Sequence, residues 1–270
     1  MRYAEYQPAP DVRAIADRYW RLTVPRAGAV ERALPDGHCE LVVHLADACV
    51  RVDGEGKETP QPSCLLIGQM TSPVDLRPAG TLDVFGVRLR PEASVADATH
   101  RIAALKEIWA AAAGRWEHQL HECRFDRERV AASDAFLRSI LCRWPAPDEQ
   151  VRAAVQSLRR GAPVARTADL VGLSRRQLER RFQEQVGLPP KVYGRLVRFQ
   201  RTLAFRRARP FAEWAEVALE NGYYDQAHLV RDFRQFAGRA PTLQELRAGG
   251  LERSLAARDA FFQDEDAARR

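Results

Sequence analysis

The chain has 270 residues, of which 46% are hydrophobic and 29% charged, and its net charge is +6. These values are ordinary for a soluble globular protein, and the length allows two domains. The start, "MRYAEYQPAPDVR", lacks the apolar core of a signal peptide, and no run approaches the roughly 18 apolar residues of a membrane helix. We therefore expect a soluble, cytoplasmic protein without a membrane partner.

Five cysteines, odd in number and widely spaced, argue for free thiols and against a disulfide framework. The sequence has no Cys-x-x-Cys pair, which disfavours a structural zinc site of that kind.

Up to about Arg90 the pattern is that of short strands. Alternation in "CELVVHLA" places Cys39, Leu41, Val43 and Leu45 on one face, and "CLLIGQ" and "LDVFGVRLR" are further strand-like runs. Turn signals such as Pro-Asp-Gly and Pro-Ala-Gly separate these runs. This punctuation predicts a small β barrel or sandwich.

On the opposite face of the first strand, His38, Glu40 and His44 share the same parity. Two histidines and a carboxylate can bind a transition metal, as in cupin-type barrels. However, His38 and His44 lie about 20 Å apart in an extended strand, and a His-x-His pair is missing. A metal site, a polar ligand pocket and a structural role therefore all stay open, and the sequence indicates no cofactor and no catalytic residue.

From Pro91 to Arg143 the pattern becomes helical, with the alanine-rich stretch "RIAALKEIWAAAAGRW". Residues 1–143 are therefore expected to form a β-rich domain with a helical C-terminal part. The proline-broken "WPAPDEQ", residues 144–150, predicts a linker. Residues 151–247 are predicted to be all helix, and residues 248–270 form a tail. The expected fold class is α+β with two domains.

The helical region contains one motif twice. Ala168 and Gly172 in the first copy match Ala218 and Gly222 in the second. Each copy reads as a short helix, a tight turn that glycine permits, and a longer helix. Ser174 and Asp225 are predicted N-caps of the longer helices, with a capping box from Ser174 to Gln177. This is the pattern of a helix-turn-helix, whose second helix enters the DNA major groove.

The outward face of each longer helix follows from its buried stripe, which in the first copy is Leu178, Phe182 and Val186. Opposite that stripe lie Arg176, Gln177, Arg180 and Glu184, with Glu179 at the rim, and in the second copy Ala227, His228, Arg231 and Gln235. Arginine can bind guanine, and glutamine adenine, through two hydrogen bonds.

Charge and spacing support the same prediction. Residues 151–247 carry 19 lysines and arginines against 9 acids, a net of +10, which leaves −4 for the rest of the chain. A basic region beside an acidic one suggests a polyanionic partner. The connecting helix from Pro189 spans about 27 Å, close to the roughly 34 Å of one DNA turn. Both longer helices could then enter successive major grooves.

With these motifs in place, residues 151–247 resemble the DNA-binding domain of AraC-family transcription regulators. The resemblance is carried by "GLSRRQLERRFQEQVGLPPKVYGRLVRFQRTL" and by the highly specific "ALENGYYDQAHLVRDFRQFAGRAP". It implies a sequence-specific regulator that binds double-stranded DNA. Position by position, it implies base contacts from Arg176, Glu179, Arg180, Gln226, Ala227 and Arg231, and a phosphate contact from His228; the helical face adds Gln177. Alanine at 227 departs from the larger polar residue often found there and leaves contact with a thymine methyl.

Residues 1–140 resemble, more loosely, a β-rich sensor domain at the front of some AraC-type regulators. The segments are "LPDGHCELVVHLAD", "IGQMTSPVDLRPAG" and "DVFGVRLRP". The resemblance implies a small-molecule effector, a second copy of the chain or RNA polymerase as further partners. The alternative from another class is a metal-dependent barrel enzyme or DNA-repair fusion with an accessory DNA-binding module; the sequence favours the regulator.

Overall fold

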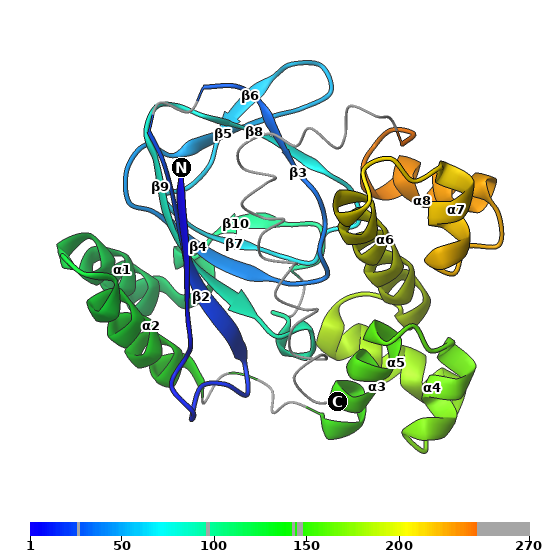
Figure 1. Ribbon diagram of the computed structural model, residues 1–270. Coiled ribbons are helices and arrows are strands. Elements are labelled where there is room, and N and C mark those ends of the chain that lie inside the picture. Colours follow the sequence, from blue (N-terminus) through cyan, green and yellow to red (C-terminus); the bar gives the residue numbers. More distant parts are fainter. Residues whose placement is uncertain (26–27, 96–97, 142–143, 145–147, 242–270) are drawn as a thin grey trace.

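The computed structural model describes residues 1–25, 28–95, 98–141, 144 and 148–241. Residues 145–147 of the predicted linker and the whole predicted tail lie outside these residues. The described part consists of a β-rich N-terminal region followed by a C-terminal region made only of helices (Figure 1). The predicted α+β class is confirmed.

The N-terminal region contains two antiparallel sheets. The larger sheet has six strands, in the spatial order β1 (Arg2–Tyr6), β2 (Ala16–Val24), β9 (Leu82–Leu89), β4 (Glu40–His44), β7 (Cys64–Ile67) and β10 (Ile102–Ala104). The smaller sheet has four strands, in the order β3 (Glu31–Ala33), β8 (Val74–Pro78), β5 (Cys49–Val52) and β6 (Glu58–Pro60). The three strand-like runs of the sequence correspond to β4, β7 and β9.

The two sheets pack face to face over a small apolar core. This core joins Trp20, Val42 and Leu65 of the larger sheet to Cys49 and Leu76 of the smaller one. Within the described residues the strands do not close into a barrel, because β1 and β10 stay at opposite edges of the larger sheet. Of the two predicted architectures, the sandwich is therefore the better description.

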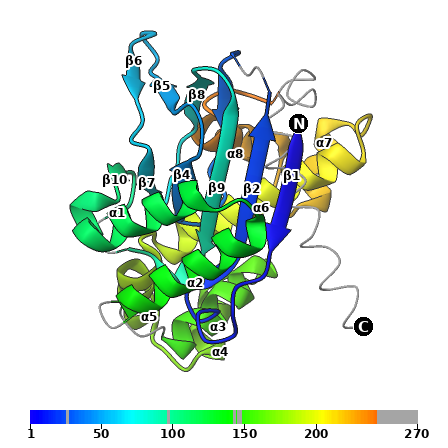
Figure 2. The ribbon, with the colours of Figure 1, turned by 90° about the vertical axis from the view of Figure 1, so that its left-hand side faces the viewer.

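The other face of the larger sheet is covered by two helices, α1 (Lys106–Glu122) and α2 (Asp126–Leu141), which cross the strands in Figure 2. Strand β4 explains why both faces are apolar. Leu41 and Val43 of this strand, and Cys39 just before it, enter the core below these helices. Val42 points to the other face and enters the core between the sheets. The predicted alternation of this strand is confirmed.

The predicted helical stretch from Pro91 is only partly correct. A short 3-10 helix, η1 (Pro91–Ala93), is followed by strand β10, and the first α-helix begins at Lys106. Residues 102–104 are extended because they pair with Leu65–Ile67 at the edge of the larger sheet. Tertiary pairing therefore overrides the helical preference of "RIAA" here.

The four described cysteines are free thiols, as expected. Burial raises the pKa of the Cys39 and Cys49 thiols to about 11 and that of Cys64 to about 12. These thiols are therefore protonated and unreactive near neutral pH.

The C-terminal region has six described helices: α3 (Glu149–Arg159), α4 (Val164–Leu170), α5 (Arg175–Val186), α6 (Pro190–Ala208), α7 (Trp214–Glu220) and α8 (Gln226–Phe236). They share one apolar core, to which both copies of the repeat contribute. Figure 1 shows the long α6 between the α4–α5 pair and the α7–α8 pair. The predicted short helix, turn and longer helix are present in each copy.

The N- and C-terminal regions are in direct contact. Leu34, in the β3–β4 connection, packs against the core of the helical region. Gln200 of α6 donates a hydrogen bond to the carbonyl of Pro35, and Arg152 of α3 pairs with the buried Glu92 of η1 at 3.3 Å. Leu34, Pro35 and Glu92 all lie outside residues 144–150. The composition of that predicted linker therefore gave no sign of the contact between the two regions.

Candidate nucleic-acid interface and interdomain cavity

Helices α5 and α8 are the second helices of the two units, and local chemistry defines where each begins. Ser174 accepts a hydrogen bond from the Gln177 amide, and the Gln177 side chain accepts one from the Ser174 amide, which confirms the capping box. Asp225 caps α8 by accepting from the amide of His228 at 2.7 Å. The turns before these caps contain Gly172 and Gly222, with φ of 66° and 74°. Left-handed backbone of this kind favours glycine.

On α5 the predicted site residues Arg176, Gln177, Glu179 and Arg180 are all exposed, whereas Leu178 is fully buried. Arg180 pairs with Glu184 at 3.3 Å, and Glu179 pairs with Arg175 at 3.1 Å. The structure therefore places these four side chains on the outer face of one helix. Because the carbonyl of the Gln177 side chain is used in the cap, its amide nitrogen is the atom left to face a ligand.

On α8 the predicted residues Gln226, Ala227 and Arg231 are exposed, and His228 is half-buried. Within the described part of the chain, Arg231 has no hydrogen-bond or ion-pair partner. The Nε2 atom of His228 lies 3.0 Å from a guanidinium nitrogen of Arg198 on α6. His228 is thus attached to the interior of the region, whereas the other three point outward.

The sequence did not predict the ionic network beneath α8. Asp232 is fully buried and pairs with Arg195 at 2.7 Å and with Arg198 at 2.9 Å. The Arg198 guanidinium also lies over the ring of Tyr223, 4.3 Å from its centroid. The available signal was the position of Asp232 beside the buried Phe233, where an acid requires a cationic partner. The network fixes α8 on α6.

The same network also affects the imidazole of His228. Burial lowers the pKa of the His228 imidazole, and the charge of Arg198 lowers it further. The ring is therefore neutral near pH 7, with Nε2 as the acceptor for Arg198. The phosphate contact predicted for His228 would therefore use the remaining ring N–H.

Between the sheets and α6 lies a cavity of about 100 Å³. Its apolar lining comes from both sheets and from α6, and includes Ile67, Val74, Leu76, Ile102 and Leu203. Its polar lining comes from the β3–β4 connection, β4, the segment after β6 and α6, and includes Asp36, His38, Glu40, Gln61, Gln200 and Arg207. Side chains from both regions of the protein therefore surround one space.

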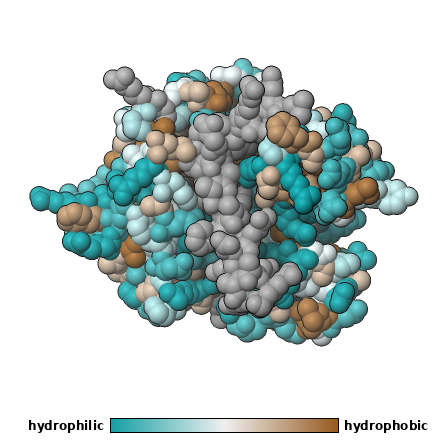
Figure 3. Space-filling view, in the orientation of Figure 1, coloured by the Kyte–Doolittle hydropathy of each residue, from teal (hydrophilic) through white to brown (hydrophobic). Residues whose placement is uncertain are grey.

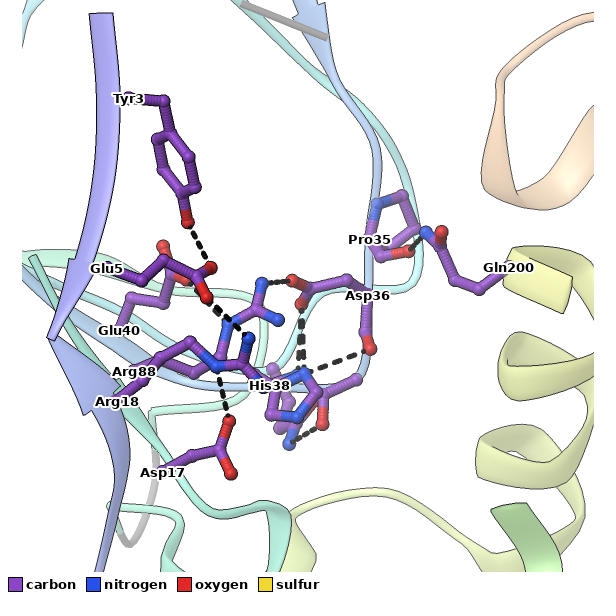
Figure 4. Close-up of polar contacts among 12 residues, drawn as sticks. Tyr3, Glu5, Asp17, Arg18, Pro35, Asp36, His38, Glu40, Arg88 and Gln200 are labelled. Carbon is purple, nitrogen blue, oxygen red and sulfur yellow. Dashed lines mark hydrogen bonds and ion pairs between the residues drawn. The ribbon is translucent and has the colours of Figure 1, made fainter. Parts of the chain in front are cut away.

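Figure 4 shows how the polar wall of this cavity is held. Arg88 on β9 is almost fully buried and pairs with Asp36 and, at 3.2 Å, with Glu40. His38 also contacts Asp36, with its Nδ1 atom 3.2 Å from the backbone carbonyl. Burial lowers the pKa of His38, and the charge of Arg88 lowers it further. This part of the wall thus consists of a neutral imidazole and two carboxylates that one guanidinium holds.

The three residues weighed as metal ligands do not form a cluster. His38 and Glu40 line the cavity, whereas His44, at the end of β4, does not. Among the described residues, no group of three or more histidine, cysteine, aspartate or glutamate side chains is arranged to hold a metal ion. Of the three interpretations left open by the sequence, a polar pocket is the one that His38 and Glu40 fit.

The visible surface of the helical region is mostly hydrophilic, with separate hydrophobic residues (Figure 3). In the described part of the chain, none of the helices has both the length and the apolar character that crossing a membrane requires.

Two segments of the chain match known domain families. Residues 4–107 match a domain of unknown function, DUF6597, and residues 167–247 match a helix-turn-helix domain. Together with two capped and outward-facing second helices, the latter match defines a DNA-binding protein with a double helix-turn-helix. The chain therefore carries a helix-turn-helix domain of the AraC type in its C-terminal region and a DUF6597 domain in its N-terminal region.

No curated protein matches the chain. Among solved structures it is similar to ToxT from Vibrio cholerae, at 11% identity and a TM-score of 0.46, over 90% of this chain and 96% of that chain. A ToxT structure described as bound to an unsaturated fatty acid gives 10% identity and a TM-score of 0.45, over 84% and 94% of the two chains. Likeness at this level carries no functional argument, and the assignment depends on the domain matches.

Proposed function

We propose that this regulator reads a specific operator with α5 and α8 and responds to a small effector in the cavity beside α6. The observation that carries the first part is the outward placement of the predicted side chains on both helices. Arg176 is an exposed cation in the first turn of α5, where side chains of a recognition helix reach base edges, and Arg180 and Arg231 are exposed cations in the second turns of α5 and α8. Each can bind guanine through two hydrogen bonds.

The remaining predicted residues receive more specific roles. Gln226 is exposed in the first turn of α8 and can pair with adenine, and Ala227 beside it can contact a thymine methyl. Gln177 and Glu179 lie between the α5 arginines and would restrict the bases they accept. His228 acts mainly by fixing α8 through Arg198.

The cavity supports the effector part of the proposal. It combines an apolar wall with a polar wall, a combination typical of small-molecule sites. We therefore assign it an effector with an apolar body and a polar group. Because Gln200, Leu203 and Arg207 belong to α6, an occupant would touch the helix that joins both DNA-reading units.

A regulator is preferred over the enzyme alternative because His38 and Glu40 line a pocket without forming a metal-type cluster with His44. A DNA reader has to share the compartment of its operator, which for this class is the cytoplasm. The domain limits predicted from the sequence, with the DNA-binding domain at 151–247, belong to the same proposal. RNA polymerase and a second copy of the chain are proposed partners on the family resemblance alone.

The test begins with the purified full chain and fragmented DNA of its own genome. Retained fragments are sequenced, and affinity for the enriched site is measured from low to moderate salt. We expect one enriched motif and a steep loss of affinity with salt, because the net charge of +10 over residues 151–247 would release counterions from phosphate. No enrichment, or an affinity that salt leaves unchanged, would contradict DNA reading by this region.

The effector part needs a separate variant. Leu203→Trp would fill the cavity, and Leu219→Trp adds the same ring on α7, where the leucine is 68% exposed. We expect only Leu203→Trp to change operator affinity and to abolish stabilisation by small amphipathic compounds in a thermal melt. Equal behaviour of both variants would remove the cavity from the proposal.

A further inference from the structure

The C-terminal end of α5 is held by the N-terminal region. The amide of Ser94 donates to the carbonyl of Gln185 at 3.2 Å, and the hydroxyl of Thr99 donates to the carbonyl of Gly187 at 3.0 Å. A Cβ atom at Gly187 would lie 2.5 Å from the Thr99 hydroxyl oxygen. The segments around Gly187 and Thr99 therefore approach more closely than a residue larger than glycine would allow. We call this pair of bonds the α5 contact.

The C-terminal end of α8 is held in the same way by another part of the N-terminal region. Arg32 on β3 donates to the carbonyl of Ala237 at 3.1 Å, at the end of α8. Its other two guanidinium nitrogens bind both carboxylate oxygens of Asp75 on β8, each at 2.7 Å. Arg32 is therefore oriented before it meets α8. We call its bond to Ala237 the α8 contact.

Both contacts lie at the end of the helix away from the bases. Recognition helices read DNA with their N-terminal residues, so a grip on the C-terminal carbonyls leaves the reading ends free. Terminal carbonyls also lack backbone partners inside their own helix and can accept from other groups, although that of Gly187 accepts as well from the Gln183 side chain at 2.8 Å. The N-terminal region thus holds each reading helix without competing with DNA for the predicted site residues.

The cavity lies between the two contacts. Ala33 and Val74 of its wall are the chain neighbours of Arg32 and Asp75. On the other side, Gly68 and Met70 of its wall flank Gln69, whose carbonyl accepts from the amide of His100, next to Thr99. A shift of the wall at Ala33 and Val74 therefore reaches the α8 contact through covalent neighbours, and a shift of the wall at Gly68 and Met70 reaches the α5 contact through this hydrogen bond.

From these observations we propose that Arg32 and Thr99 are positioning residues for DNA recognition: they fix the separation of α5 and α8 and so determine which spacing of half-sites the protein accepts. This rests on the proposed function, since it requires both helices to read DNA. The cavity occupant then acts by moving one contact relative to the other. Without these two contacts, the separation of α5 and α8 would be set only by α6 and by the apolar core of the helical region.

The test uses the full chain and its enriched operator, with base pairs added or removed between the two half-sites. Thr99→Val removes the side-chain donor of the α5 contact and leaves the bond from the Ser94 amide, whereas Thr99→Ser keeps both bonds. Arg32→Gln removes the α8 contact, and the matched control Arg77→Gln makes the same change on β8, where Arg77 pairs with Glu58. The measured quantity is the ratio of affinities for the native spacing and for a spacing altered by about two base pairs.

We expect Thr99→Val and Arg32→Gln each to lower this ratio about fivefold, the effect of one net hydrogen bond. Affinity for a single half-site should stay unchanged, which also shows that the variants are folded. Thr99→Ser and Arg77→Gln should behave as the unmodified chain. A merely structural role would weaken all DNA sites together and leave the ratio constant.

An unchanged ratio in both Thr99→Val and Arg32→Gln, with intact half-site binding, would overturn the inference and leave α6 as the sole determinant of spacing. The inference would also be overturned if Arg77→Gln lowered the affinity ratio as much as Arg32→Gln. Failure of the proposed function itself is distinguishable, because the unmodified chain would then retain no specific DNA at any spacing.

Discussion

At the scale of single residues, the exposed arginines differ in how they are held. Arg180 pairs with Glu184 across one helical turn, an exposed pair that contributes only about 0.3–0.5 kcal/mol. Such a pair can exchange its partner for a base at little cost. Arg231 is the corresponding residue of the second copy and has no partner within the described residues. In our proposal, both positions of the repeat present a guanidinium group to DNA. Arg180 would first have to leave its ion pair with Glu184, whereas Arg231 would not.

We predict that Arg180→Ala and Arg231→Ala each cost roughly 1–3 kcal/mol of operator binding and relax base preference at one position. The two relaxed positions should lie about one helical turn apart. Competitive binding to a randomised operator library measures both effects. Arg77→Ala, which removes the same charge from the N-terminal region, serves as the control. Equal weakening on every sequence would mean that these arginines contact only phosphate.

The buried His44 predicts a dependence of stability on pH. Burial lowers the pKa of its imidazole, and the neighbouring Gln61 opposes this in part. As the pH is lowered below the ordinary histidine pKa of about 6.5, the unfolded chain binds more protons than the folded one. The free energy of unfolding therefore decreases as the pH is lowered. Melting temperatures measured from about pH 7 to about pH 5 should fall less steeply for His44→Leu than for the unmodified chain. Parallel curves would show that His44 titrates normally in the folded protein.

At the scale of elements, each helix-turn-helix unit is stabilised by a few fully buried side chains. Leu178, Phe182 and Val186 of α5 are 0% exposed, as are Leu229 and Phe233 of α8. The outward faces of the same helices carry the polar side chains that we propose to read DNA. In this proposal, reading and folding use different residues of one helix, and mutations can separate them.

We predict that Leu178→Asp abolishes DNA binding by unfolding the first unit. The substitution places a charge in the apolar core without a partner, which costs several kcal/mol. Leu170→Asp in the neighbouring α4 is the matched control, since Leu170 is 69% exposed. Circular dichroism should show lost helix only for Leu178→Asp. A folded but inactive Leu178→Asp protein would contradict the burial of this side chain.

At the scale of the whole molecule, the helical region has its own core and also contacts the N-terminal region at several places. Except for Leu34, the residues of that core lie within 151–237. A region with its own core can fold alone, whereas contacts such as those of Arg32 and Thr99 control its arrangement. Folding and regulation are thus distributed over different parts of the chain.

We predict that a fragment from about Asp148 to Arg247 is soluble, helical and able to bind the operator. Its response to an effector should be absent, and its affinity lower if the N-terminal region pairs subunits, because tethering two readers raises effective concentration. Without Arg32 and Thr99 it should also tolerate altered half-site spacing. Circular dichroism and footprinting of the fragment and the full chain test this. An insoluble fragment would show that the N-terminal region is part of the folding unit.

Much of the helical region could be predicted from the sequence because its determinants are local. The glycines of the turns, the caps at Ser174 and Asp225, and the apolar spacing of Leu178 and Phe182 act within one or two helical turns. The same spacing indicated which side chains face outward. The alternation of β4 was equally local, since side chains of a strand point to opposite faces in turn.

Only the tertiary structure decided how these pieces meet. The strand at Ile102–Ala104 exists because β7 lies beside it, and the Asp232 network exists because α6 brings Arg195 and Arg198 to α8. The cavity, too, combines residues from both sheets and α6 that lie far apart in the sequence. Local patterns encode the conformation and the faces of each element, whereas long-range contacts depend on the summed packing of all of them. The reading helices are therefore visible in the sequence, and the contacts at their C-terminal ends are visible only in the fold.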